Sequence, residues 1–141
     1  MLHTGVAANG VDRTLEYSRP VRSLKLWLAF RLYGAATLRR WIEVTAEHAR
    51  MLAQALAGDP HFELLNDPLL SVVCFRHLAE GDLDAHNLRL AGAIRDDGRV
   101  YLAPAIVDGK TCLRVCFMNF RTDADHVEEL LSVIQELAAT A

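Results

Sequence analysis

Apolar residues follow a helical spacing in the first part of the chain, and in its first segment they occupy nearly every direction around the helix. Pro20 suits a helix start, because its missing N–H would have no partner there. Residues 22–33 then contain the apolar side chains of Leu24, Leu26, Trp27, Leu28, Phe30, Leu32 and Tyr33. A helix that is apolar all round must be covered all round. We therefore expect part of this surface to meet another domain or another chain.

A second helix is predicted directly after this segment, with Gly34 as the joint between the two. The helical period resumes over residues 35–57, where the inner stripe consists of Leu38, Ile42, Thr45, Ala49, Leu52 and Leu56. Gly58 tolerates a left-handed conformation, and Pro60 cannot continue a helix. The pattern thus predicts one long helix in two parts that ends near residue 57.

Two pairs of strands are predicted downstream. Residues 61–65 and 70–77 read as strands joined by a turn at Asn66-Asp67-Pro68. Residues 100–107 and 110–118 flank Asp108-Gly109, a two-residue turn whose positive φ angles match the twist of paired strands. Both pairs are expected to form antiparallel hairpins.

One helix is predicted between the hairpins and one after them. Asp84 is a candidate cap for the first, which has Leu88, Ala91 and Ile94 on its inner face and ends at Gly98. Residues 122–125 open the last helix, whose apolar face contains Val127, Leu130, Leu131, Ile134 and Leu137.

This order of elements predicts an α+β fold. We expect a small antiparallel sheet of about four strands in two hairpins, with helices on one face, preceded by the long two-part helix. Residues 1–17 show neither period and are expected to form an extended or partly disordered lead-in. Residues 18–141 are expected to form one domain.

Composition narrows the function classes. The chain has 141 residues and a formal net charge of −3, so we expect neither a nucleic-acid partner nor a membrane partner. No secretory signal pattern or membrane-spanning run is recognisable, which favours a cytoplasmic protein. Three cysteines, Cys74, Cys112 and Cys116, lie in apolar runs and are expected to be free and buried.

Motifs for catalysis or metal binding are absent from the sequence. The six histidines are spread without ligand spacing, so surface or capping roles are favoured over a metal site. Asp123 and Asp125 beside His126 resemble a charged first helical turn rather than an acid–base site. Lys25 lies in a very apolar helix, where we expect it to extend its amine to the surface or to pair across a domain interface.

Arg114 is the most informative charged residue. It lies mid-strand in an apolar run, where an unpaired buried charge would be costly. It shares a face with Cys112 and Cys116, whereas Leu113, Val115 and Phe117 share the other. From the residues alone, a solvent-facing position or an ion pair within the domain is the favoured interpretation.

Several short motifs resemble one known family. They are residues 18–27 (Ser-Arg-Pro-Val-Arg-Ser-Leu-Lys-Leu-Trp), Phe30-Arg31-Leu32-Tyr33-Gly34, Val72-Val73-Cys74-Phe75-Arg76 and Leu113-Arg114-Val115. Together they resemble the C-terminal domain of the group II pyridoxal-phosphate-dependent amino-acid decarboxylases, the aromatic-L-amino-acid decarboxylase family. The resemblance runs from about residue 16 to residue 137.

The resemblance implies a small domain of a fold-type-I pyridoxal-phosphate enzyme that releases CO₂ and an amine from an L-amino acid. The cofactor, its lysine and the catalytic residues are expected in a large domain that this chain does not contain, and the enzyme is expected to be a homodimer. The resemblance also implies two substrate-binding residues here. Arg114 would face the active site and engage a carboxylate, and Ser18 would border the pocket for the substrate side chain.

Two alternatives remain open from the sequence. The chain could be a stand-alone module that binds a small carboxylate or another protein, using the surface around Arg114. It could also be the complementing half of a split decarboxylase. On the main interpretation and on the split-enzyme alternative, we expect the isolated chain to be inactive and to bind no cofactor by itself.

Overall fold

The computed structural model describes residues 21–139 and divides the chain into two compact units. The first unit is Met1–Leu38 and the second is Arg39–Ala141. Helix α1, Arg22–Ala57, begins in the first unit and continues into the second. The predicted lead-in, residues 1–17, lies outside the described residues.

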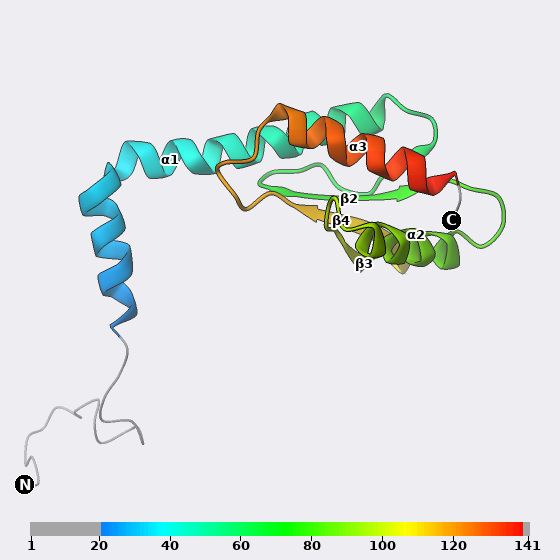
Figure 1. Ribbon diagram of the computed structural model, residues 1–141, viewed down its shortest axis with the longest axis horizontal. Helices are drawn as coiled ribbons and strands as arrows, with labels where there is room; N and C mark the ends of the chain where they lie inside the picture. Colours follow the sequence, from blue (N-terminus) through cyan, green and yellow to red (C-terminus); the bar gives the residue numbers. More distant parts are fainter. Residues whose placement is uncertain (1–20, 140–141) are drawn as a thin grey trace, which may run out of the picture. The chain divides into compact units, whose positions relative to one another are not determined.

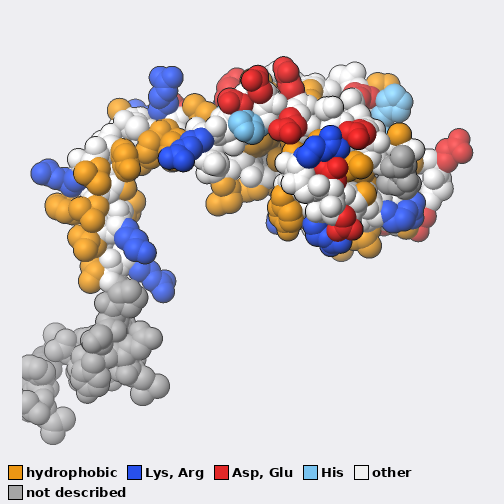
Figure 2. All heavy atoms as spheres, in the orientation of Figure 1, with side chains coloured by type: hydrophobic (Ala, Val, Ile, Leu, Met, Phe, Trp, Pro, Cys, Tyr) orange, Lys and Arg blue, Asp and Glu red, His pale blue; other side chains and the backbone are white. Residues whose placement is uncertain are grey.

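The first unit contains the apolar part of α1, which we call the arm and define as residues 21–33. Its large apolar side chains are between 42 and 74% exposed, and Figure 2 shows hydrophobic side chains spread along it. Gly34 follows with φ 77° and ψ 159°, a conformation essentially restricted to glycine. The predicted joint at Gly34 is therefore confirmed as a break in the helix.

The second unit is built around a four-stranded antiparallel sheet. The strands are β1 (Phe62–Leu64), β2 (Val72–His77), β3 (Ala103–Val107) and β4 (Lys110–Cys116). Their order across the sheet is β1-β2-β4-β3. Each predicted hairpin is present, and the two hairpins join through β2 and β4, which pair Cys74 with Arg114 and Phe75 with Leu113.

All three helices pack on one face of this sheet (Figure 1). They are the later part of α1, α2 (Leu83–Asp97) and α3 (Ala124–Ala138). One hydrophobic cluster joins them to the sheet, with members that include Leu52, Leu56, Val73, Phe75, Leu90, Ile94, Leu113, Val115, Leu130 and Ile134. The second unit therefore has the predicted α+β architecture, two layers with the core between them.

Local signals explain most of the element ends. The turn at Asp108-Gly109 has φ angles of 49° and 75°, as a type I′ hairpin requires. Asp123 caps α3, and its carboxylate and His126 form a reciprocal capping box. Gly98 ends α2 in the left-handed conformation.

Four sequence predictions need correction. The cap of α2 is Asp82, whose carboxylate accepts from the N–H groups of Asp84 and Ala85, because Asp84 uses its own carboxylate elsewhere. Leu88 and Ile42 were expected on inner faces but are 57% and 62% exposed. Cys116 is exposed rather than buried. All four strands are also shorter than predicted, since β1 is Phe62–Leu64, β2 is Val72–His77, β3 is Ala103–Val107 and β4 is Lys110–Cys116.

Candidate functional site

Arg114 lies in the middle of β4 on the sheet face opposite the helices. Its flanking residues Leu113 and Val115 enter the core, so alternation turns the Arg114 side chain outward, where it is exposed. Cys74 on β2 and Ala103 on β3 are its partners across the sheet. Within residues 21–139 no hydrogen bond or ion pair engages its guanidinium. We call this side of the sheet the open face.

A second arginine, Arg76, shares the open face but is buried. Its Nη2 donates to Asp84 Oδ1 at 3.0 Å, and the same oxygen accepts from the backbone N–H of Thr111 at 3.0 Å. Asp84 thus ties the end of β2 and the start of β4 to the first turn of α2. The Nε atom of Arg76 is buried and has no partner among the described residues.

The cysteines of the open face are free thiols. Cys74 and Cys112 are buried there, and burial raises the pKa of the Cys112 thiol, with a further increase from the neighbouring Cys74. Register places them diagonally across β2 and β4, with their side chains next to each other. Their predicted role as buried free thiols is confirmed for these two.

The described residues do not form a site for pyridoxal phosphate. The chain has two lysines, and that cofactor requires one beside a phosphate-binding group and a carboxylate. Lys110 is ion-paired with Glu63. Lys25 lies on the arm among exposed apolar side chains. Ser18, the other predicted substrate-binding residue, lies outside the described residues.

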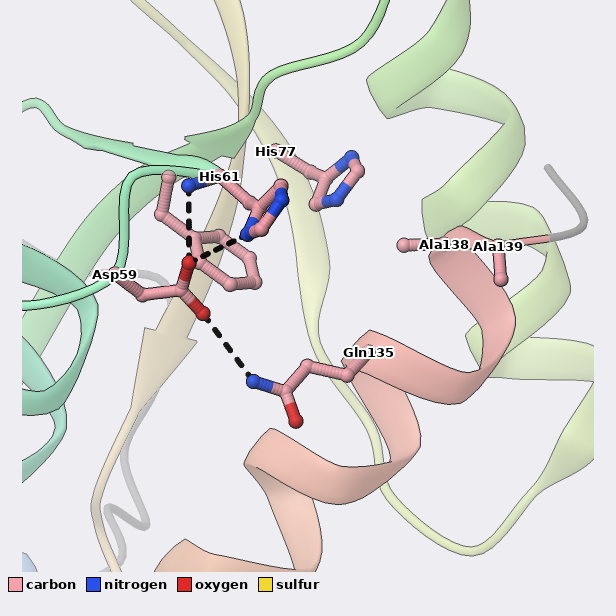
Figure 3. A pocket seen from close by; sticks show the side chains of 7 residues that line it. Asp59, His61, His77, Gln135, Ala138 and Ala139 are labelled. Carbon is pink, nitrogen blue, oxygen red and sulfur yellow. Dashed lines mark hydrogen bonds and ion pairs between the residues drawn. The ribbon is translucent and has the colours of Figure 1, made fainter.

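Histidines gather at one end of the sheet, although the sequence showed no such cluster. A cavity of about 560 Å³ is lined by Asp59, His61, Phe62, His77, Gln135, Ala138 and Ala139 (Figure 3). Asp59 Oδ1 accepts from the N–H of His61 and contacts its Nδ1 at 2.8 Å. Gln135 on α3 donates to the other carboxylate oxygen at 3.3 Å.

Behind this cavity, two histidine rings share a hydrogen bond. His77 Nδ1, at the end of β2, lies 2.9 Å from Nε2 of His86, which is buried on α2. The rings of His77 and Phe62 also pack edge to face, with their centroids 5.2 Å apart. Asn87 binds the backbone of His77 twice, since its Oδ1 accepts from the N–H and its Nδ2 donates to the carbonyl.

Burial and charge shift two of these ionisable groups. Burial lowers the pKa of His77 below its ordinary value, and the neighbouring His86 lowers it further. The backbone N–H and then the ring of His61 hold the pKa of Asp59 below its usual range. At neutral pH the site therefore combines a neutral His77 with an ionised Asp59.

Sequence spacing did not reveal this cluster because its members come from four separate segments: the turn before β1, β2, α2 and α3. In the sequence, His77 lies at the end of a predicted strand, and His86 lies near an inner position of a predicted helix. These two positions were the signal that could have indicated the cluster. No group of three or more His, Cys, Asp or Glu side chains among residues 21–139 could hold a metal ion. In the same part of the chain no helix combines the length and apolarity needed to cross a bilayer.

Comparison with known proteins gives a consistent picture. A family model, that of the pyridoxal-dependent decarboxylase conserved domain, matches residues 1–78, more than half of the chain. Phenylacetaldehyde synthase of Arabidopsis thaliana is 32% identical over 132 residues, which cover 91% of this chain and 27% of that protein. Tyrosine decarboxylase 2 of the same plant is 35% identical over 135 residues, covering 93% and 25%.

Solved structures agree with the sequence matches. Tryptophan decarboxylase of Catharanthus roseus, crystallised with L-tryptophan, matches with a TM-score of 0.79 and 32% identity, over 85% of this chain and 26% of that one. The chain thus spans about a quarter of the length of the relatives it matches. The motifs, the α+β fold and these matches lead to one conclusion: the chain belongs to the pyridoxal-phosphate-dependent decarboxylase family.

Proposed function

We propose that residues 18–141 are the C-terminal small domain of a pyridoxal-phosphate-dependent decarboxylase that converts an L-amino acid to an amine and CO₂. The observation that carries the proposal is the match of nearly the whole chain to one quarter of tryptophan decarboxylase, at a TM-score of 0.79. The cofactor and its lysine would belong to a large domain outside this chain. A cytoplasmic homodimer is the proposed form of the whole enzyme.

An aromatic L-amino acid is the proposed substrate. The names of several relatives support this class, since they include tyrosine decarboxylase 2 and aromatic-L-amino-acid decarboxylase. Another structural match is an L-2,4-diaminobutyrate decarboxylase domain, at 32% identity and a TM-score of 0.77. The fold is therefore compatible with different side chains, and the pocket walls of the large domain would choose among them.

Arg114 is proposed to bind a carboxylate of the substrate. Its guanidinium is exposed, and within residues 21–139 no acidic side chain pairs with it. A planar guanidinium can hold a carboxylate through two parallel hydrogen bonds. Ser18 is proposed to border the substrate side chain, and this role rests on the resemblance of its motif.

A chimeric enzyme tests the proposal. The matching quarter of Catharanthus roseus tryptophan decarboxylase would be replaced by residues 18–141 of this chain, and release of CO₂ from L-tryptophan would be measured. We expect a folded chimera that retains decarboxylation, because the two domains share one fold. A chimera that folds and loads cofactor yet releases no CO₂ would contradict the proposal.

The role of Arg114 is tested in the same chimera. Arg114→Ala should lower kcat/KM by about 30-fold or more, the loss expected for charge-assisted hydrogen bonds of roughly 2 kcal/mol. Arg89→Ala removes an exposed arginine from α2 and serves as the matched control. Equal effects of the two substitutions would refute a substrate contact by Arg114.

A further inference from the structure

The hydrogen bond between His77 and His86 depends on their protonation. One ring nitrogen must donate a proton and the other must accept it, so at least one ring has to be neutral. If both rings were charged, two donors would face each other at 2.9 Å. The contact would then change from attraction to repulsion.

This contact holds two elements together. His77 is the last residue of β2, and His86 lies in the first turns of α2. Asn87 reinforces the same junction through its two hydrogen bonds to the His77 backbone and a third to the carbonyl of Leu83. Because His86 is only 4% exposed, a charge on it could not be solvated without local opening.

The groups that face His77 offer little compensation for a positive charge. From α2 it faces the ring of His86, and from the turn before β1 it faces His61 and Asp59. Asp59 is the carboxylate of this set, and it is already bound by His61 and by Gln135 of α3. The carboxylate of Asp82 caps α2, and Asp84 is held by Arg76 and Thr111.

We propose that the His77–His86 pair is a proton-sensitive joint that fastens the end of β2 to the start of α2 at neutral pH and releases it on acidification. Release would loosen His77, which also lines the 560 Å³ cavity. The joint would thereby change the shape and the charge of that cavity with pH. This inference concerns residues of this chain alone and does not depend on the proposed decarboxylase activity.

The pH window follows from linkage. The folded state lowers the pKa of His77 from an ordinary value of 6.5, so between the two values the unfolded chain binds more protons than the folded chain. The stabilising contribution is complete above about pH 6.5 and is lost as pH falls from there through the folded pKa. The pKa values of Asp59, Asp97 and Asp123 are lowered from 3.8, so these carboxylates change the stability at pH values below this window.

Urea unfolding of the full 141-residue chain at pH 7.5 and pH 5.5 tests the joint. The folded-to-unfolded ratio of the unmodified chain should fall further than that of His86→Gln, because the substitution removes the part of the lowering of the His77 pKa that His86 causes. His126→Gln alters an exposed capping histidine and should retain the pH dependence of the unmodified chain. Identical pH dependence in His86→Gln and the unmodified chain would overturn the proposal.

A direct measurement covers the case in which His86→Gln does not fold. Nitrogen-15 NMR of the unmodified chain should show the His77 ring titrating below pH 6.5. Amide exchange at His77 and Leu78 should accelerate over the same range. Titration of the His77 ring at or above pH 6.5, with unchanged amide exchange, would overturn the proposal as well.

Discussion

At the scale of single residues, Asp84 connects its helix to two strands of the sheet. Its Oδ1 accepts from Arg76 on β2 and from the N–H of Thr111 on β4, while its backbone lies in the first turn of α2. The side chain of Arg76 is only 7% exposed. Removal of its carboxylate partner would leave a buried charge without compensation.

Asp84→Ala should therefore destabilise the second unit. We expect a loss of about 2 kcal/mol, less than for a fully buried pair because the Asp84 side chain is half exposed. Asp96→Ala removes an exposed pair with Arg95 and should change stability by less than about 0.5 kcal/mol. Urea denaturation of both variants measures the difference, and equal losses would refute the role given to Asp84.

Residue positions were predictable where one local rule decided them. Alternation placed Leu113 and Val115 on one face of the strand and Arg114 on the other, and the structure agrees. Asp82 and Asp84 both fit the pattern of a helix cap, and only the tertiary bonds of Asp84 decide between them. The contact of His77 with His86 was equally out of reach, because it depends on how β2 meets α2.

At the scale of elements, Gly34 divides α1 through its own backbone. Its φ of 77° with ψ of 159° is inaccessible to residues with a side chain at low energy. No atom lies within 4 Å of the place where a Cβ would be. The break therefore depends on conformation rather than on lack of space.

Gly34→Ala should convert the break into continuous helix. Alanine is the best helix former and cannot hold the observed dihedral angles without strain. Cα chemical shifts of residues 33–35 should move to helical values, with an increase in helical circular dichroism. Persistence of a positive φ at position 34 would contradict this expectation.

Gly92→Ala provides the matched control within α2. A Cβ there would lie 4.0 Å from Arg95 Nη2, and Gly92 lies in ordinary helix. We expect this substitution to stabilise the protein by about 0.5–1 kcal/mol without a change in secondary structure.

The types and order of the elements followed from periodicity and turn chemistry. Asp108-Gly109 fixed the second hairpin, because both positive φ angles suit those residues. The adjacency of β2 and β4 was not predictable, since it is set by packing of two hairpins against the helices rather than by any local pattern. The same holds for the late start of β3 and for the end of β4 at Cys116, which pairs with the first residue of β2.

At the scale of the whole molecule, the arm is an apolar surface that the described part of this chain leaves exposed. It carries Leu26, Trp27 and Leu32 with more than half of each side chain exposed. Contiguous exposed apolar surface marks an interaction site in soluble proteins. The matched relatives are about four times as long as this chain. A protein of that length has additional surface that could cover the arm.

The isolated chain should therefore self-associate through the arm. Sedimentation velocity should show an average mass that rises with concentration. The double variant Leu26→Glu and Leu32→Glu should suppress that rise, because it places charges in the contact. Ser23→Glu with Ala36→Glu adds the same charge at exposed small residues and should not. A monomer at every concentration of the unmodified chain would contradict this prediction.

The central claim is that this chain does not bind pyridoxal phosphate by itself, and one measurement tests it directly. Purified 141-residue chain would be mixed with pyridoxal phosphate, reduced with borohydride and examined by mass spectrometry and visible absorbance. Because Lys110 is paired with Glu63 and Lys25 lies on the exposed arm, we expect no stoichiometric attachment at either lysine. One cofactor bound per chain at a single lysine, with a visible absorbance band that hydroxylamine removes, would contradict the account.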